Sequence, residues 1–255
     1  MQIRFTKRTV LGAVVCAIAA GAALLGATSA QATGVPGQGT WETTLQGRDL
    51  DGNALNGPEA FYDTALNITW LRNANAAGLM NWVTANAWAN SLVVGGIGGW
   101  RLPTMLDTGN PGCDFSYAGG TDCGYNVQTR SGGTTFSEMG HLFYVTLGNK
   151  AFCDPALSTI DSCVGPQPGW GLTNTGNFQN MQPAYYWSAL GFDAGIVWTF
   201  RTNEGSQVLD LKDYARNALA VRPGDVAAPV PEPQTLALLL AGLGALLLVH
   251  RRRPR

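Results

Sequence analysis

The sequence predicts a mixed α+β domain with two short helices, several short strands and long loops. Three observations support this class. Apolar residues recur at helical spacing in 81–92 and again in 137–148. Short runs rich in aromatic and β-branched residues are separated by Gly-rich turns. Four cysteines form two pairs with nine residues between partners, which is typical of disulfide-closed loops in an exported chain.

The first helix is expected to begin after Asn81, whose side-chain oxygen can accept a hydrogen bond from a free N–H of the first turn. Gly95 and Gly96 end the pattern, because glycine readily adopts the conformation that closes a helix. Pro103 then favours extended backbone at the residue before it. The apolar positions that share one helix face are Trp82, Ala85, Ala89 and Leu92.

The second helix is expected over 137–148, with Ser137 as its cap and Gly148 as its end. His141 lies on it and is the sole histidine of residues 33–226. The chain contains neither Gly-x-Ser-x-Gly nor His-Glu-x-x-His, so we interpret His141 as a residue at the edge of the core rather than a catalytic base.

Strand composition occurs in six runs. The residues between them are rich in glycine and proline, as expected for turns. The expected strands are 39–45, 61–64, 66–71, 184–189, 195–200 and 217–222, with 61–71 forming a hairpin.

Both ends of the chain have the composition of targeting segments. A basic start, an apolar run over 10–25 and the small residues around Gln31 predict a secretory signal peptide at 1–32, followed by a linker at 33–40. At the other end, Pro231-Glu232-Pro233 precedes a predicted transmembrane helix at 235–249 and a cluster of arginines. This order resembles a PEP-CTERM sorting signal, here at 227–255. The resemblance implies a Gram-negative source, an exosortase-type processing enzyme, an inner-membrane intermediate and delivery to the cell surface.

The charge of the remaining body excludes some partners. Of 16 basic residues, seven lie in the two end segments, whereas of 17 acidic residues Glu232 alone lies there. The body therefore carries nine basic and 16 acidic residues, a net charge of −7. Nucleic acids and anionic membranes select basic surfaces, so we expect neither as a partner.

Cys113, Cys123, Cys153 and Cys163 allow three disulfide connectivities. We favour Cys113–Cys123 and Cys153–Cys163, since each pair would close a local loop rich in turn-forming residues. A zinc site is the alternative, but its ligands within a pair are usually two to four residues apart.

Asp49, Asp51 and Asn53 have the spacing that opens a calcium-binding loop. The pattern then fails, because Ala54 replaces the invariant glycine and Ala60 the bidentate glutamate. An Asp-rich turn is the preferred interpretation. We expect no metal site, cofactor or catalytic set.

Two ordered motifs carry a family resemblance. Trp100-Arg101-Leu102-Pro103-Thr104 is followed much later by Tyr186-Trp187-Ser188, and the hairpin at 61–71 precedes both. Over 41–226 the chain resembles the DUF1566 family, also called the Lcl C-terminal domain family. The resemblance implies a C-type-lectin-like or formylglycine-generating-enzyme-like α+β fold. Its named member is an adhesin domain that binds glycosaminoglycans.

The function expected from these observations is a non-enzymatic, exported surface or matrix protein that binds carbohydrate or acts as an adhesin. An enzyme on a formylglycine-generating-type scaffold and a purely structural matrix protein are the alternatives. Most aromatic residues are expected in the core, and Arg101 is expected to pair with Asp63 or Asp107. A ligand surface is expected on the loops at 105–133, 153–170 and 191–213.

Overall fold

The computed structural model describes residues 34–108 and 112–226. The predicted signal peptide and sorting tail, including the transmembrane helix at 235–249, lie outside these residues. Within the described part of the chain, no helix has the length and apolar character needed to cross a membrane.

The described chain is mixed α and β, with more strand than helix. Helix α1 covers Trp41–Thr44, α2 covers Trp82–Ser91, and α3 covers Glu138–His141 and continues as a π-helical turn over Leu142–Thr146. The strands are β1 (Leu45–Arg48), β2 (Ala60–Asp63), β3 (Ile68–Leu71), β4 (Phe115–Ser116), β5 (Cys123–Tyr125), β6 (Arg130–Ser131), β7 (Thr134–Thr135), β8 (Tyr185–Gly191), β9 (Ile196–Arg201), β10 (Ser206–Leu211) and β11 (Val221–Pro223).

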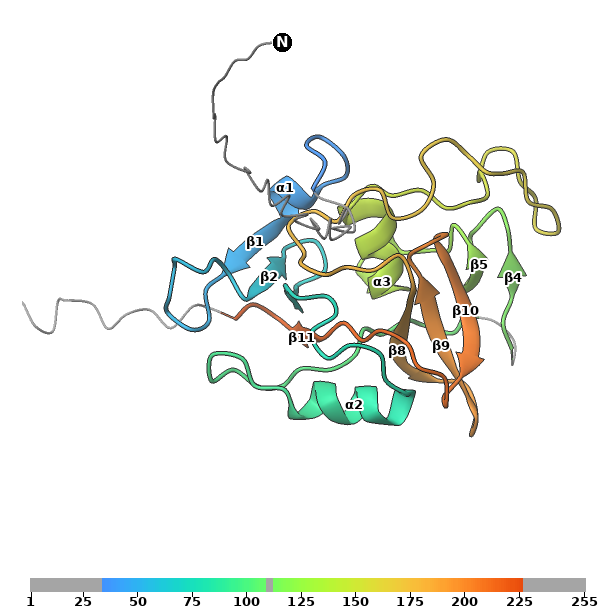
Figure 1. The fold of residues 1–255 in the computed structure, drawn as a ribbon. Helices are drawn as coiled ribbons and strands as arrows, with labels where there is room; N and C mark the ends of the chain where they lie inside the picture. The colour runs from blue at the N-terminus through green and yellow to red at the C-terminus, as the bar shows by residue number, and fades with distance from the viewer. Residues whose placement is uncertain (1–33, 109–111, 227–255) are drawn as a thin grey trace, which may run out of the picture. The chain divides into compact units, whose positions relative to one another are not determined.

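Two sheets organise the fold (Figure 1). The first has the order β1-β2-β3-β11 and is antiparallel throughout. The second has the order β4-β5-β10-β9-β8, and its β4–β5 pair is parallel. Helix α2 runs beneath β8 and β11 in Figure 1, and α3 lies between the sheets. The expected β2–β3 hairpin is confirmed, with Phe61 opposite Trp70.

Helix α2 begins where the sequence predicts. The Asn81 side chain accepts a hydrogen bond from the Thr84 N–H at 2.9 Å. Ala85 and Ala89 are fully buried and belong to the same apolar cluster as Trp187 of β8. The small alanines let the helix lie close to the sheet, so α2 covers one face of β8 and β9.

Helix α3 also begins at its predicted cap, where Ser137 Oγ accepts from the Gly140 N–H. The structure differs further along, because α-helical bonding stops after one turn and the Leu147 N–H reaches the carbonyl of Leu142, five residues back. Gly148 then has φ +65°, and a Cβ there would lie 2.5 Å from the Gly39 backbone nitrogen. The helix ends there because the linker passes against it.

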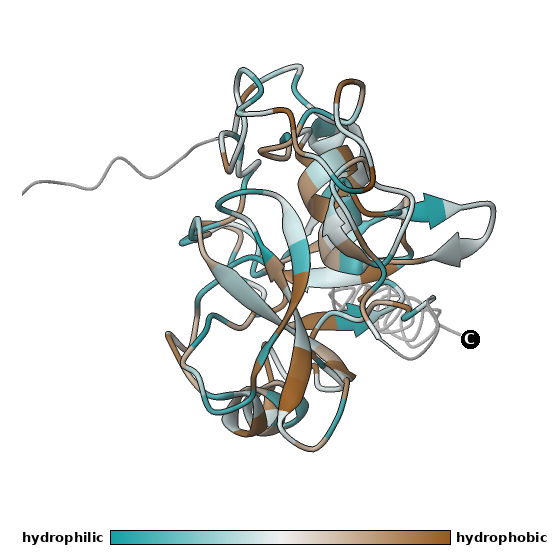
Figure 2. Cartoon of the chain, turned by 90° about the vertical axis from the view of Figure 1, so that its right-hand side faces the viewer, coloured by the Kyte–Doolittle hydropathy of each residue, from teal (hydrophilic) through white to brown (hydrophobic). Residues whose placement is uncertain are grey.

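The core is built from large aromatic residues, as expected. Trp70, Trp100, Trp187 and Trp198 are each at most 1% exposed. Trp82 and Trp88 remain partly exposed on α2. Figure 2 shows hydrophobic stretches on both the helices and the strands, with hydrophilic residues between them.

Some strand predictions are wrong or missing. The run at 39–45 is not a strand, because the Thr40 carbonyl accepts from the N–H groups of Thr43 and Thr44 and forms the α1 turn instead. Strand β1 begins at Leu45. Strand β10, which pairs with β9 over six residues, has no counterpart among the predictions, nor do the short strands β4 to β7.

Candidate functional site

The two motif segments singled out in the sequence, 100–104 and 186–188, meet inside the protein. The Ala189 N–H donates to the Pro103 carbonyl at 2.7 Å, and the Trp187 indole donates to the Met80 carbonyl at 2.8 Å. Tyr186 is fully buried, and its hydroxyl accepts from the Gln182 N–H. The segments border a cavity of about 10 Å³, which is at most the size of one water molecule. These residues join the two halves of the core and leave no room for a ligand between them.

Arg101 pairs with Glu138, so the expected partners Asp63 and Asp107 are wrong. Arg101 Nη2 lies 2.6 Å from Glu138 Oε1, and Nη1 lies 2.7 Å from Oε2. Glu138 also accepts from the Thr104 N–H at 2.7 Å. The side chain of Glu138 is nearly buried, because the start of α3 packs against the segment that carries Arg101. Arg101 is therefore committed to an internal ion pair.

His141 lies deeper than predicted, with 5% of its surface exposed. Neither ring nitrogen has a hydrogen-bond partner among the described residues. Burial lowers the pKa of His141, a nearby Asp63 raises it and Arg130 lowers it further. Among the described residues, no hydrogen-bonded group orients this buried imidazole, as a neighbouring acid or base orients a catalytic histidine.

The Asp-rich turn forms as expected. The Gly52 N–H donates to Asp49 Oδ1, and the Asn53 N–H donates to Asp51 Oδ1. A hydrogen bond from Asn56 lowers the pKa of Asp51. Glu59, which the sequence pattern did not connect with this turn, brings its carboxylate within 4.8 Å of both aspartates. Asp51 is exposed and the other two are partly exposed; acidic groups often gather in this way at a protein surface without an ion, and we assign none to them.

Two disulfides hold the long loops, Cys113–Cys123 and Cys153–Cys163, which is the pairing favoured from the sequence. The loops lie against each other. The Asn126 side-chain amide donates to the carbonyls of Tyr117 and Cys153, at 3.0 and 2.9 Å. None of these four cysteines is a free thiol.

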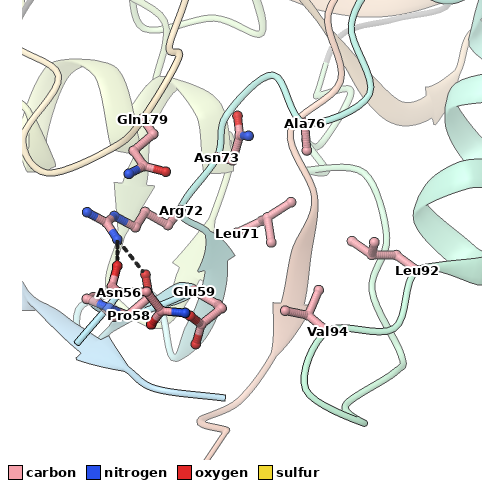
Figure 3. A pocket seen from close by; sticks show the side chains of 10 residues that line it. All are labelled: Asn56, Pro58, Glu59, Leu71, Arg72, Asn73, Ala76, Leu92, Val94 and Gln179. Atoms are coloured by element: carbon pink, nitrogen blue, oxygen red, sulfur yellow. Dashed lines mark hydrogen bonds between the residues drawn. The ribbon is translucent and has the colours of Figure 1, made fainter. Parts of the chain in front are cut away.

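A pocket of about 340 Å³ opens at the end of the β2–β3 hairpin, away from the loops that were expected to carry a ligand (Figure 3). We call it the Arg72 pocket. Its lining residues are Asn56, Pro58, Glu59, Leu71, Arg72, Asn73, Ala76, Leu92, Val94 and Gln179.

Backbone pairing holds the polar side of the Arg72 pocket together. The Arg72 N–H donates to the Glu59 carbonyl at 2.8 Å, which extends the β2–β3 ladder by one pair. The Gln179 N–H donates to the Arg72 carbonyl at 2.9 Å, and the Ala74 N–H donates to the Gln179 carbonyl. Residues 107 positions apart are thereby fixed side by side.

The Arg72 guanidinium is fixed by main-chain oxygens. Its Nη1 donates to the carbonyls of Pro58 and Asn56, at 3.1 and 3.3 Å. Gly57 has φ +76°, and a Cβ there would lie 3.0 Å from Nη1, so glycine permits this close approach. Arg72 has no carboxylate partner among the described residues, and its buried Nε has no hydrogen-bond partner among them.

The opposite side of the Arg72 pocket is aliphatic. Figure 3 shows Leu71, Leu92, Val94 and Ala76 around the open space, with Arg72, Asn73 and Gln179 on the other side. Leu92 and Val94 come from the glycine-rich segment after α2, where Val94 pairs with Ile97 in a tight turn. The pocket is therefore divided into a polar wall and an apolar wall.

A second, more open hollow of about 320 Å³ lies on β9 and β10, beside Ile196, Leu209, Leu211 and Tyr214. It falls largely within 191–213, one of the segments expected to carry a ligand surface. Asp210 is its sole charged lining residue and is already paired with Arg216 at 2.8 Å. The Arg72 pocket, with several polar groups, is the better candidate.

One comparison with known families gives a match. The PEP-CTERM protein-sorting motif matches residues 229–253, which contain Pro231, Glu232 and Pro233. This motif implies an exported protein that is recognised by an exosortase and sorted to the cell surface or exterior. The match covers the tail and leaves 41–226 outside it. A search of curated proteins found no match to the chain.

Proposed function

We propose that the body at 41–226 is a non-enzymatic carbohydrate-binding or adhesin domain that the sorting motif delivers to the cell exterior. The observation that carries the binding part is the Arg72 pocket, because its polar and apolar walls match the two kinds of surface on a sugar ring. Ligand pockets generally combine an apolar lining with a few fixed polar groups. Membership of the DUF1566 family and a C-type-lectin-like fold are part of this proposal.

The absence of catalysis is likewise a proposal. A thiol-dependent oxidase on a formylglycine-generating-type scaffold needs reactive cysteines, whereas Cys113, Cys123, Cys153 and Cys163 are joined in disulfides. His141 is buried without a partner among the described residues. Counting the free thiols of the exported protein distinguishes a binding protein from a thiol-dependent oxidase. Four blocked cysteines would agree with a binding protein, and a free reactive pair would favour the oxidase.

A glycan array probed with the purified full-length chain tests the binding function. The expected result is retention of at least one class of neutral, acidic or sulfated glycan. Silence on all three classes would reject carbohydrate binding and favour a purely structural matrix protein. The array measures ligand binding by the folded body, so its result does not bear on export through the sorting motif.

A further inference from the structure

Resting on the proposed carbohydrate binding, we propose that the Arg72 pocket binds an uncharged pyranose ring rather than an acidic or sulfated sugar. The pocket volume of about 340 Å³ is at the small end of the roughly 300–1,000 Å³ of ligand pockets. It therefore suits a chain end or a single ring with its linkage, not a long segment of polysaccharide.

The two walls fit the two surfaces of a pyranose. One face of such a ring is formed by C–H groups, which gain free energy when they leave water against aliphatic side chains such as Leu92 and Val94. The edge of the ring carries hydroxyls, each of which can both donate and accept. Gln179 is exposed beside Arg72, and its side-chain amide has no hydrogen-bond partner among the described residues.

Glu59 supplies the acceptor. Its Oε2 accepts from the Leu50 N–H at 2.7 Å, which fixes the carboxylate and leaves Oε1 for a hydroxyl donor. Hydrogen bonds from a neutral donor to a carboxylate are stronger than those between two neutral groups. An uncharged sugar uses this acceptor fully, whereas an acidic sugar brings a second negative charge to it.

The local charge explains why an acidic sugar is disfavoured even though Arg72 is a cation. Arg72 turns Nη1 toward the Pro58 and Asn56 carbonyls, and its Nε is buried. Glu59 adds one negative charge, and Asp49 and Asp51 bring two more within 4.8 Å of it. One positive and three negative charges give this corner a negative balance, and like charges at such distances repel. The same negative balance should weaken the binding of a sulfated sugar.

The test is titration calorimetry of the full-length chain with uncharged gluco-, galacto- and manno-oligosaccharides and with an oligogalacturonate of equal length. We expect an uncharged sugar to bind at least tenfold more tightly than the oligogalacturonate. Ala76→Tyr should weaken that binding tenfold or more, because the new side chain would occupy the pocket. Ala87→Tyr places the same side chain at an exposed site on α2 outside the pocket, and should bind as the parent does.

Glu59→Gln provides the second readout. Glutamine keeps an acceptor for the Leu50 N–H but removes the charge, so the preference for the uncharged sugar over the oligogalacturonate should fall at least threefold. Tighter binding of the oligogalacturonate by the parent would overturn the inference, as would sugar binding that Ala76→Tyr leaves unchanged. In both cases carbohydrate binding itself would stand. Failure of every sugar to bind would reject the proposed function together with this site.

Discussion

Arg101 and Glu138, 37 residues apart in the sequence, form a two-point ion pair that clamps the start of α3 to the segment after α2. Both guanidinium Nη atoms reach the carboxylate, and the Thr104 N–H adds a third hydrogen bond. The Glu138 N–H donates back to the Thr104 carbonyl. Glu138 is therefore a nearly buried carboxylate whose counter-charge can be removed by mutating Arg101, and the effect on the free energy of unfolding can be measured.

Replacing Arg101 with methionine should lower the free energy of unfolding by about 3 kcal/mol, because it leaves Glu138 buried without its counter-charge. Urea denaturation at neutral pH measures the change. The pair Arg48–Asp225, whose carboxylate side chain is 38% exposed against 6% for Glu138, is the matched control, and Arg48→Met there should cost less than about 1 kcal/mol. Equal losses at the two sites would contradict the assignment of Arg101–Glu138 as a structural clamp.

Replacing Asn81 with alanine should destabilise the protein by about 1 kcal/mol, since the Thr84 N–H loses its acceptor at the start of α2. Asn81→Ser keeps a side-chain oxygen that can accept this hydrogen bond and should cost only a few tenths of a kcal/mol. Thermal unfolding of the two variants side by side gives the comparison. If alanine and serine behave alike, the cap contributes nothing to stability.

The pH dependence of stability should carry the signature of His141. Burial lowers the pKa of its imidazole below the ordinary value of about 6.5. Between that value and the lowered one, the unfolded chain binds a proton that the native protein does not. The free energy of unfolding therefore has its full value above about pH 6.5 and decreases as the pH falls below it, because protonation favours the unfolded chain.

Urea denaturation at pH 7.5, 6.5 and 5.5 measures this effect. His141→Met removes the titrating group and should flatten the dependence over this range, while His250 remains in both proteins. A variant with the same slope as the parent would show that another group causes it.

Reducing the disulfides should loosen their loops more than the helices. Each disulfide closes a short loop and restricts the unfolded chain, an effect worth about 3 kcal/mol per bond in the chain-entropy model. Hydrogen exchange with and without reductant should show lost protection over 113–123 and 153–163 before α2 and α3. Earlier loss in the helices would mean that the loops support the core.

The sequence predicted the parts of the fold that depend on local signals. The caps Asn81 and Ser137 satisfy backbone groups within their own first turn, so both helix starts were found. The hairpin ending at Leu71 also had a readable pattern. Strands of two or three residues, such as β4 and β6, are too short to show a period of two. Their partners β5 and β7 lie only a few residues further along the chain, but runs this short do not show an alternating pattern of their own.

The site was not predictable from local signals. The sequence singled out Arg101 but not its partner, because Glu138 is brought to it by the packing of α3. No sequence pattern connects Arg72 with Gln179, since an arginine and a glutamine in separate loops form no motif. Their juxtaposition comes from the parallel bridge between Asn73 and Gln179. Tertiary structure alone makes a pocket of these residues.

That bridge links occupancy of the Arg72 pocket to the melting temperature. The unfolded chain separates Gln179 from Arg72 and has no pocket, so any molecule that binds there acts on the native state alone. A ligand at one hundred times its dissociation constant would add about 2.7 kcal/mol to the free energy of unfolding. Heating the protein with one compound at a time would therefore identify an occupant without labelling or immobilising either partner.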